Sequence, residues 1–127
     1  MADRRKTALL VEDDEKVRAL VKKYLERMGF DVVEVVGGYA AMAQLDTLRP
    51  DFVCLDLMLP ESSGFEVCEF IRRHDELREV PVLVISARAQ PADRAAAEES
   101  GASAYLVKPF TLRQFTAQVA ALVPTDG

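Results

Sequence analysis

Short apolar runs alternate five times with longer amphipathic segments along this chain. The apolar runs favour strands at residues 7–11, 31–36, 52–56, 81–86 and 104–107. The segments between and after them carry apolar residues at helical spacing, which predicts helices over residues 15–28, 39–48, 64–74, 91–100 and 112–122. Strands that alternate with helices predict a parallel sheet with helices on both faces, because parallel strands need a crossover connection.

A single carboxylate, Asp56, ends the otherwise apolar run that starts at Phe52. A strand that is buried on both faces is almost entirely apolar, and a lone charge there destabilises the fold unless it is paired or bound to a metal. Ligands in parallel sheets bind at the carboxyl ends of the strands. We therefore expect the partners of Asp56 at the ends of the other strands.

Polar side chains do follow three more of the predicted strands. Glu12 and Asp13 follow the first, Ser86 ends the fourth, and Lys108 follows the fifth. Three carboxylates at one sheet edge repel one another unless a cation lies among them, and oxygen ligands without His or Cys suit Mg²⁺. Taken singly, these residues could be a helix cap, a strand-end serine and a surface lysine, and we favour the cap for Asp14 or for Glu15, but not for all of these acids. Together they predict a site where a carboxylate beside Mg²⁺ attacks phosphorus.

Composition and charge exclude several other classes of protein. At 127 residues the chain is long enough for one domain, with an expected core over about residues 6–123 and short tails. The net charge is −5 without a Lys/Arg stripe, which argues against direct nucleic-acid binding by this chain. No run approaches the roughly 18 apolar residues of a membrane span, and no export signal is recognisable, so we expect a cytoplasmic location. Cys54 and Cys68 lie in apolar contexts and are interpreted as small core residues.

The chain resembles the response-regulator receiver domains of bacterial two-component signalling over nearly its whole length. The resemblance rests on four motifs in order, LLVEDD, DLMLPESSG, PVLVISA and GASAYLVKPF. It implies an α/β, doubly wound, flavodoxin-like fold with five helices and a five-stranded parallel sheet in the order 2-1-3-4-5. It also implies that Asp56 accepts phosphate from a sensor histidine kinase or phosphotransfer protein, and that Lys108 contacts this phosphate. The implied ligands of Mg²⁺ (or Mn²⁺) are Glu12, Asp13, Asp56 and the backbone carbonyl of Met58.

The resemblance further implies a switch formed by Ser86 and Tyr105. We expect the Ser86 hydroxyl to move toward the phosphate, after which an exposed Tyr105 turns inward and reshapes the surface of the last two helices and the strand at 104–107. The expected partner-contacting residues on this surface are Arg88, Tyr105, Gln114 and Gln118. We also predict a cis Lys108–Pro109 bond, from the resemblance and because the chain must turn sharply to aim Lys108 at Asp56.

The leading interpretation is a protein-interaction switch that catalyses its own phosphorylation and slow dephosphorylation. One alternative is the receiver part of a larger regulator with an effector domain beyond residue 127, since the ending VPTDG is linker-like. A metal-dependent phosphatase would use the same acids but needs a further acid or base. A flavodoxin-like cofactor binder is disfavoured because VEDDEK, after the first strand, is acidic where a phosphate loop would be needed.

Overall fold

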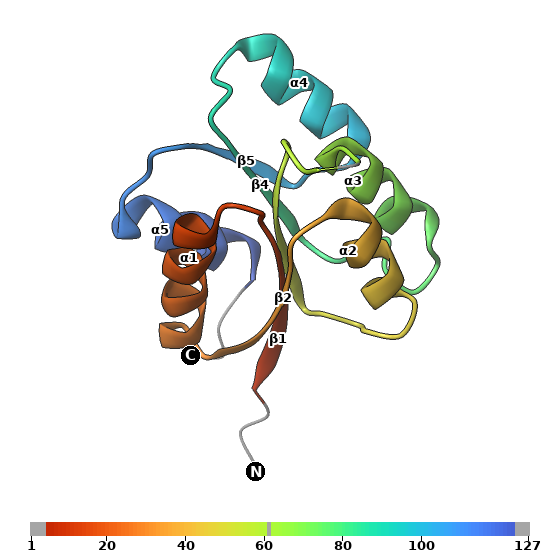
Figure 1. The fold of residues 1–127 in the computed structure, drawn as a ribbon, viewed down its shortest axis with the longest axis horizontal. Helices are drawn as coiled ribbons and strands as arrows, with labels where there is room; N and C mark the ends of the chain where they lie inside the picture. The colour runs from red at the N-terminus through yellow and green to blue at the C-terminus, as the bar shows by residue number, and fades with distance from the viewer. Residues whose placement is uncertain (1–4, 61, 124–127) are drawn as a thin grey trace.

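The computed structural model describes residues 5–60 and 62–123, so most of the two expected tails lies outside the described residues. Five strands alternate with five helices, as the hydrophobic pattern predicts (Figure 1). In chain order the elements are β1 (Lys6–Val11), α1 (Glu15–Arg27), β2 (Phe30–Val35), α2 (Gly38–Leu45), β3 (Phe52–Asp56), α3 (Gly64–Arg73), β4 (Val82–Ser86), α4 (Pro91–Ser100), β5 (Ala104–Val107) and α5 (Leu112–Leu122). None of the helices in the described part is long and apolar enough to cross a membrane.

The five strands form one parallel sheet in the order β2-β1-β3-β4-β5, which confirms the predicted fold. In Figure 1, α1 and α5 lie on one side of the sheet and α2 and α3 on the other. The core is accordingly divided in two. Val21 and Phe115 pack in the half beneath α1 and α5, and Leu45, Ile71 and Ala97 pack in the half beneath α2, α3 and α4.

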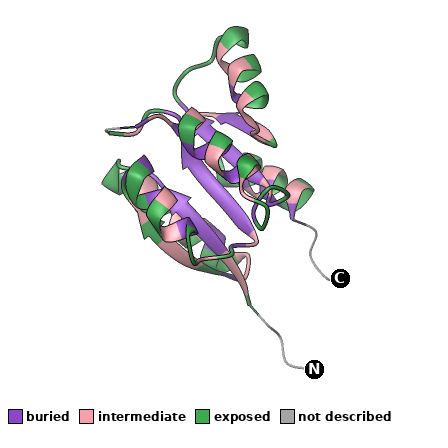
Figure 2. Cartoon of the chain, turned by 90° about the vertical axis from the view of Figure 1, so that its right-hand side faces the viewer, coloured by how far each residue is buried: buried purple, intermediate pink, exposed green. Residues whose placement is uncertain are grey.

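Alternate residues of the central strands enter opposite halves of the core. In β3, Val53 and Leu55 belong to the half beneath α2 and α3, whereas Phe52 and Cys54 belong to the half beneath α1 and α5. Every residue of β3 is therefore buried, which explains why its sequence is a continuous apolar run (Figure 2). Cys68 packs in the half opposite to Cys54, and both thiols are free and buried, as expected of small core residues.

Helix α2 ends three residues earlier than the prediction, at Leu45 rather than Leu48. The Arg49 guanidinium donates hydrogen bonds to the carbonyl oxygens of Leu45, Asp46 and Leu48, at 2.7, 3.3 and 3.0 Å. The last carbonyl groups of a helix lack partners within the helix, and here a following side chain supplies them. The turn before Pro50 is therefore stabilised by Arg49, a contact that helical periodicity does not reveal.

Arg72 of α3 connects the end of α4 to the residues that precede β4 and β5. These contacts lie at the amino ends of the strands, opposite the carboxyl ends of β3 and β4. Its guanidinium donates to the carbonyl oxygens of Gly101, Arg78 and Val80 at 2.7–2.8 Å, and to the Ser103 hydroxyl at 3.2 Å. Gly101 has a φ of +116°, and a Cβ at this position would clash with the Arg72 side chain. Glycine is thus required twice at the end of α4, for its backbone conformation and for this close approach.

We predict that Gly101→Ala destabilises the protein more than Gly29→Ala. Gly29 also has a positive φ, of 97°, but a Cβ there would meet nothing within 4 Å. Gly29→Ala should therefore cost only the left-handed conformation, about 1–2 kcal/mol. Gly101→Ala must also displace Arg72 from its carbonyl partners, for a total of about 3 kcal/mol or more. Urea unfolding followed by circular dichroism measures both losses, and equal losses would contradict the role given to Arg72.

Candidate active site

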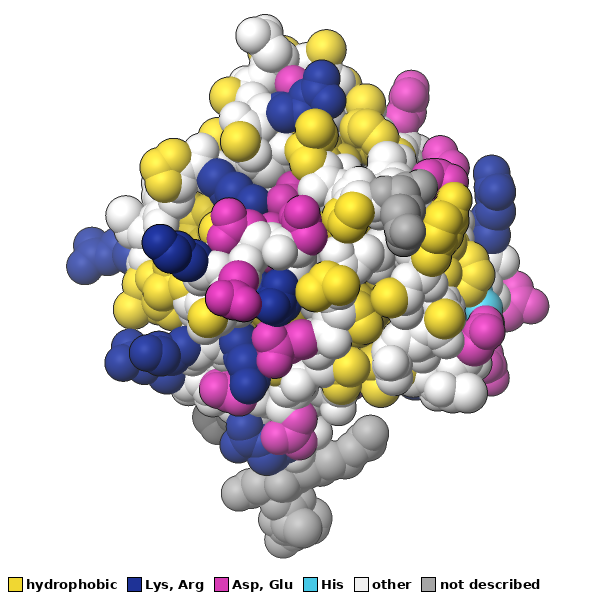
Figure 3. Space-filling view, viewed as in Figure 1, with side chains coloured by type: hydrophobic (Ala, Val, Ile, Leu, Met, Phe, Trp, Pro, Cys, Tyr) yellow, Lys and Arg dark blue, Asp and Glu magenta, His cyan; other side chains and the backbone are white. Residues whose placement is uncertain are grey.

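Four charged side chains meet at the carboxyl ends of β1, β3 and β5. Carboxylate oxygens of Glu12, Asp13 and Asp56 lie within 4.8 Å of one another. Lys108 Nζ lies 2.8 Å from Asp56 Oδ2 and 3.1 Å from Glu12 Oε1. Figure 3 shows acidic side chains gathered over the connection from β1 to α1, with basic side chains beside them. The structure thus brings together the four charged residues that the sequence places at the strand ends.

Asp56 is held firmly although it is almost fully buried, with 4% of its surface exposed. Its Oδ1 accepts the backbone N–H of Met58 at 3.0 Å, and its Oδ2 accepts a hydrogen bond from Lys108. These bonds supply the partners that the apolar setting of β3 demands. The Met58 carbonyl, implied as a metal ligand, belongs to the same residue whose N–H orients Asp56, and its role stays a prediction.

Gly64 allows α3 to begin directly against the end of β3, a contribution that the sequence analysis missed. A Cβ on Gly64 would lie 2.6 Å from the backbone oxygen of Asp56 and 2.8 Å from Leu57 Cα. The Gly64 N–H also donates to the Leu57 carbonyl at 2.9 Å. The position of a glycine just inside the start of α3, after the loop that follows Asp56, is the signal that could have identified it.

Glu12 is fully buried, and its two carboxylate oxygens have different surroundings. Its Oε2 accepts the backbone N–H of Asp14 at 3.0 Å. Its Oε1 lies near Lys108, but among the described residues it has no partner in hydrogen-bonding geometry. Burial raises the pKa of the Glu12 carboxyl, and the negative charge of Asp56 raises it further, against the lowering effect of the Asp14 N–H and of Lys108. Glu12 therefore carries its charge at a cost that a nearby cation would offset.

The ammonium group of Lys108 supplies one positive charge beside Glu12 and Asp56. Burial alone would lower the Lys108 pKa, but its hydrogen bond to Asp56, its close contact with Glu12 and the negative charges of both acids outweigh burial and raise it. Three carboxylates still face this one ammonium, so a divalent cation would balance the excess negative charge. Oxygen ligands of this kind, two buried and one exposed at Asp13, fit Mg²⁺, which keeps part of its water shell.

Ser86 and Tyr105 are connected through the backbone of Arg88. Ser86, at the buried end of β4, accepts the Arg88 N–H with its Oγ at 3.1 Å. The Tyr105 hydroxyl donates to the Arg88 carbonyl at 2.9 Å, and the Arg94 guanidinium lies 5.1 Å from the centre of the Tyr105 ring. Tyr105 is only 4% exposed, so the expectation of an exposed tyrosine is wrong. Its hydroxyl bond to Arg88 and the cation above its ring hold it inward without any phosphate.

The other expected surface residues are more accessible than Tyr105. Arg88 and Gln114 are exposed, and Gln118 is half-buried. The Arg88 guanidinium lies 3.1 Å from the Asp93 carboxylate of α4. The Lys108–Pro109 peptide bond is cis, which confirms the prediction.

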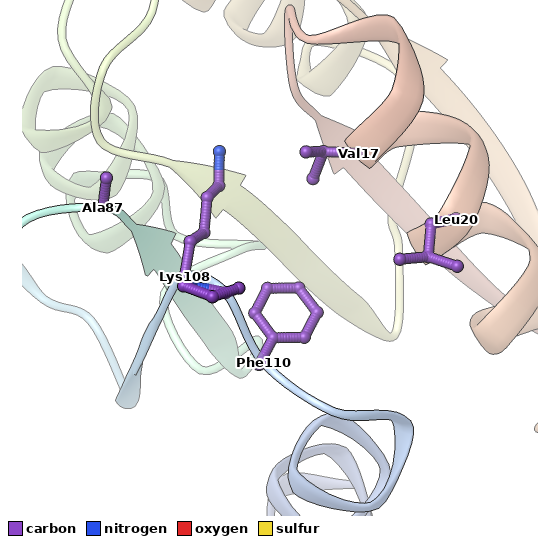
Figure 4. Close-up of a pocket in the computed structure, with 6 residues that line it drawn as sticks. Val17, Leu20, Ala87, Lys108 and Phe110 are labelled. Atoms are coloured by element: carbon purple, nitrogen blue, oxygen red, sulfur yellow. The ribbon is translucent and has the colours of Figure 1, made fainter.

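An apolar pocket of about 340 Å³ adjoins Lys108 between α1 and the β5–α5 connection. Figure 4 shows Val17 and Leu20 facing it from α1, with Lys108 and Phe110 on the other side. Leu20 is 42% exposed although it is one of the apolar residues at helical spacing in α1. It lies at the edge of the apolar stripe of α1, whose fully buried residues are Val21 and Leu25.

Comparisons with known proteins agree with this fold and show the family of the chain. The family model described as "Response regulator receiver domain" matches residues 8–120. The DNA-binding dual master transcriptional regulator RpaA of Synechocystis sp. is 40% identical over 115 residues, which cover 91% of this chain and 48% of RpaA. The chain belongs to the family of response regulator receiver domains. It spans about half the length of the curated relatives it matches.

Two solved structures in the same family contain a metal ion. The receiver domain of sensor histidine kinase PA1611 from Pseudomonas aeruginosa, with magnesium in its active-site cleft, has a TM-score of 0.87 at 26% identity and covers 96% of this chain and 100% of its own. The Mn²⁺-bound response regulator Rcp1 has a TM-score of 0.80 at 29% identity and covers 96% and 97%. RpaA is a DNA-binding regulator, and the chain matches about half of it. The expectation of no direct nucleic-acid binding is therefore made for this chain alone.

We predict that Glu12→Gln stabilises the metal-free protein at neutral pH. A raised pKa in the folded state means that the charged carboxyl costs stability above that pKa, and that the cost disappears as the pH falls through it. The amide has nearly the same shape without the charge, and Lys108 retains Asp56 as a partner.

Asp13→Asn is the matched control, because Asp13 is exposed. It should weaken Mg²⁺ binding, as Glu12→Gln does, but leave the metal-free stability nearly unchanged. Urea unfolding without Mg²⁺ and calorimetric Mg²⁺ titration measure the two effects. A Glu12→Gln protein that is less stable than wild type at neutral pH would show that the buried charge is already fully compensated.

Proposed function

We propose that this chain is a phosphorylation-controlled switch in which Asp56 accepts a phosphoryl group from a sensor histidine kinase or phosphotransfer protein. The observation that supports this most directly is the position of Asp56, buried at a strand end, bound by Lys108 at 2.8 Å and next to two further acids. Glu12 and Asp13 would hold Mg²⁺ with Asp56 and the Met58 carbonyl, and Mn²⁺ could take the same place.

The proposed reaction is an in-line transfer between a donor imidazole and Asp56. A carboxylate oxygen of Asp56 forms a bond to phosphorus while the N–P bond of the phosphohistidine breaks, and the imidazole leaves with the electron pair. When bound, Mg²⁺ would supply positive charge for the phosphoryl oxygens. Lys108 supplies a second positive charge beside Asp56, and the Ser86 hydroxyl supplies a hydrogen-bond donor. Water later hydrolyses the acyl phosphate and restores the carboxylate.

The apolar pocket beside Lys108 gives the phosphodonor a surface to contact. Val17 and Leu20 of α1 line it together with Phe110, and Lys108 of the charged site is also part of its lining. An exposed apolar surface next to a charged site is typical of protein contacts. The encounter would take place in the cytoplasm, where response regulators typically work.

The proposed output surface is formed by α4, β5 and α5. Arg88 accepts the Tyr105 hydroxyl bond and donates to Ser86, so a Ser86 hydroxyl that turns toward a phosphate would release the Arg88 N–H and disturb Tyr105. Helix α4 can respond at little cost, because Ala97 is its only buried residue. The chain spans about half the length of the transcriptional regulators that it matches. We therefore propose that an effector domain beyond residue 127 contacts this surface and responds to its change.

We predict that acetyl phosphate labels wild-type protein only when Mg²⁺ is present, because the cation offsets the repulsion between the acids and the phosphate. Asp56→Asn should abolish the label, and Asp51→Asn, at a half-buried acid outside the site, should retain it. Labelling is measured by mass spectrometry and by release with hydroxylamine, which cleaves acyl phosphates. Retention of a hydroxylamine-sensitive label in Asp56→Asn would disprove the assignment of the acceptor.

We predict that a beryllofluoride mimic of the phosphate changes amide chemical shifts on α4, β5 and α5 as well as around Asp56. In Ser86→Ala, which lacks the hydroxyl bonded to the Arg88 N–H, the changes at Asp56 should persist while those on the distant surface shrink. If wild-type changes stay confined to the loops around Asp13, Asp56 and Ser86, the output surface lies elsewhere.

A further inference from the structure

Arg18 of α1 contacts the backbone of the connection that carries the acids. Its Nη1 donates to the Glu12 carbonyl at 2.9 Å and lies 3.4 Å from the Asp13 carbonyl. Its Nε lies 3.3 Å from the Glu34 carboxylate of β2. The Arg18 side chain is only 18% exposed, and its contact with the Glu12 carbonyl is partly buried, whereas Asp13 and Glu34 lie at the surface. Arg18 therefore links α1, β2 and the two residues that follow β1.

The connection between β1 and α1 is short and has few other restraints. The Glu12 N–H donates to the Val35 carbonyl at 3.1 Å, and Asp14 caps α1 by accepting the N–H groups of Lys16 and Val17. The Asp14 N–H also donates to Glu12 Oε2 and so restrains that side chain. None of these bonds involves the carbonyl groups of Glu12 and Asp13. The guanidinium of Arg18 contacts both carbonyl groups and so restrains the backbone from which the two carboxylates project.

We infer that Arg18 is a positioning residue for the metal site and acts through the backbone of Glu12 and Asp13. The inference rests on the proposed role of these acids as Mg²⁺ ligands. Outer contacts that orient ligands commonly change metal affinity 10–100-fold when removed. The fork of Arg18 makes this possible, because one nitrogen binds the carbonyl groups while another is anchored on Glu34.

Charge alone would give the opposite result from positioning. Arg18 is a cation close to a cation site, so its removal should tighten Mg²⁺ binding if only electrostatic attraction mattered. Lys22 provides a matched comparison within the same network. It lies 3.4 Å from Glu34, as a partner of the same carboxylate, but none of the hydrogen bonds or ion pairs among the described residues joins it to Glu12 or Asp13. Figure 3 shows basic and acidic side chains side by side over α1 and β2.

The experiment measures the Mg²⁺ dissociation constant of wild type, Arg18→Lys, Arg18→Met and Lys22→Met by calorimetry. Arg18→Lys keeps the charge but cannot hold the carbonyl groups and Glu34 together, so we expect about a 10-fold weaker affinity. Arg18→Met should also bind more weakly, despite the loss of a repelling charge. Lys22→Met should stay within about two-fold of wild type, because the Lys22 side chain is 39% exposed, its charge is partly screened by salt, and it has no bond to Glu12 or Asp13 among the described contacts.

A second measurement does not require the metal. Amide hydrogen exchange of residues 12–15 in metal-free protein should be faster in both Arg18 variants than in Lys22→Met, and the rest of β1 should be unchanged. Glu34→Gln, which removes the carboxylate that Arg18 and Lys22 share, should weaken Mg²⁺ binding about two- to three-fold relative to Lys22→Met and serves if Arg18→Met does not fold. Wild-type affinity in Arg18→Lys, or tighter binding in Arg18→Met, would overturn the inference. Failure of wild type to bind Mg²⁺ would instead overturn the proposed function.

Discussion

The contact between Lys108 and the two buried carboxylates is the interaction on which the site depends. Asp56 and Glu12 are both removed from water at the end of an apolar sheet, where a charge without a partner destabilises the fold. One ammonium reaches both of them, at 2.8 and 3.1 Å. It partly compensates the acids and leaves an excess of negative charge that a cation would offset.

The sheet imposes this arrangement, which is why much of it could be predicted from the sequence. Parallel strands place their carboxyl ends at one edge, so Glu12, Asp56 and Lys108 meet although they are far apart in the chain. Hydrophobic periodicity identified all five strands and helices because most of their residues face one of two cores. The features that depend on strand direction and burial could therefore be predicted from the sequence.

What the sequence analysis missed depends on side-chain reach rather than on periodicity. Arg49 ends α2, Arg72 fastens α4, and Arg18 binds the connection after β1, and each does so by donating to backbone carbonyl groups. An arginine on or just after a surface helix is usually solvated, so nothing in the local pattern distinguishes these three from the others. Tyr105 was misplaced for a related reason, because its burial depends on the Arg88 carbonyl and the Arg94 guanidinium, which come from another part of the chain.

Helix α4 is fastened unequally at its two ends, and this asymmetry determines how the structure can respond at the site. Its C-terminal end is fixed where Gly101 passes beneath Arg72, through a hydrogen bond at 2.8 Å and a close approach that excludes a Cβ. Its N-terminal end is held by an ion pair between the exposed Arg88 and the partly buried Asp93 and by the Arg94 contact with Tyr105. An ion pair with one solvated partner contributes little stability, so the N-terminal end is the more weakly held of the two. Only residues 87–90 separate that end from Ser86, so under the proposed function a displacement of the Ser86 hydroxyl would reach it before the end that Arg72 holds.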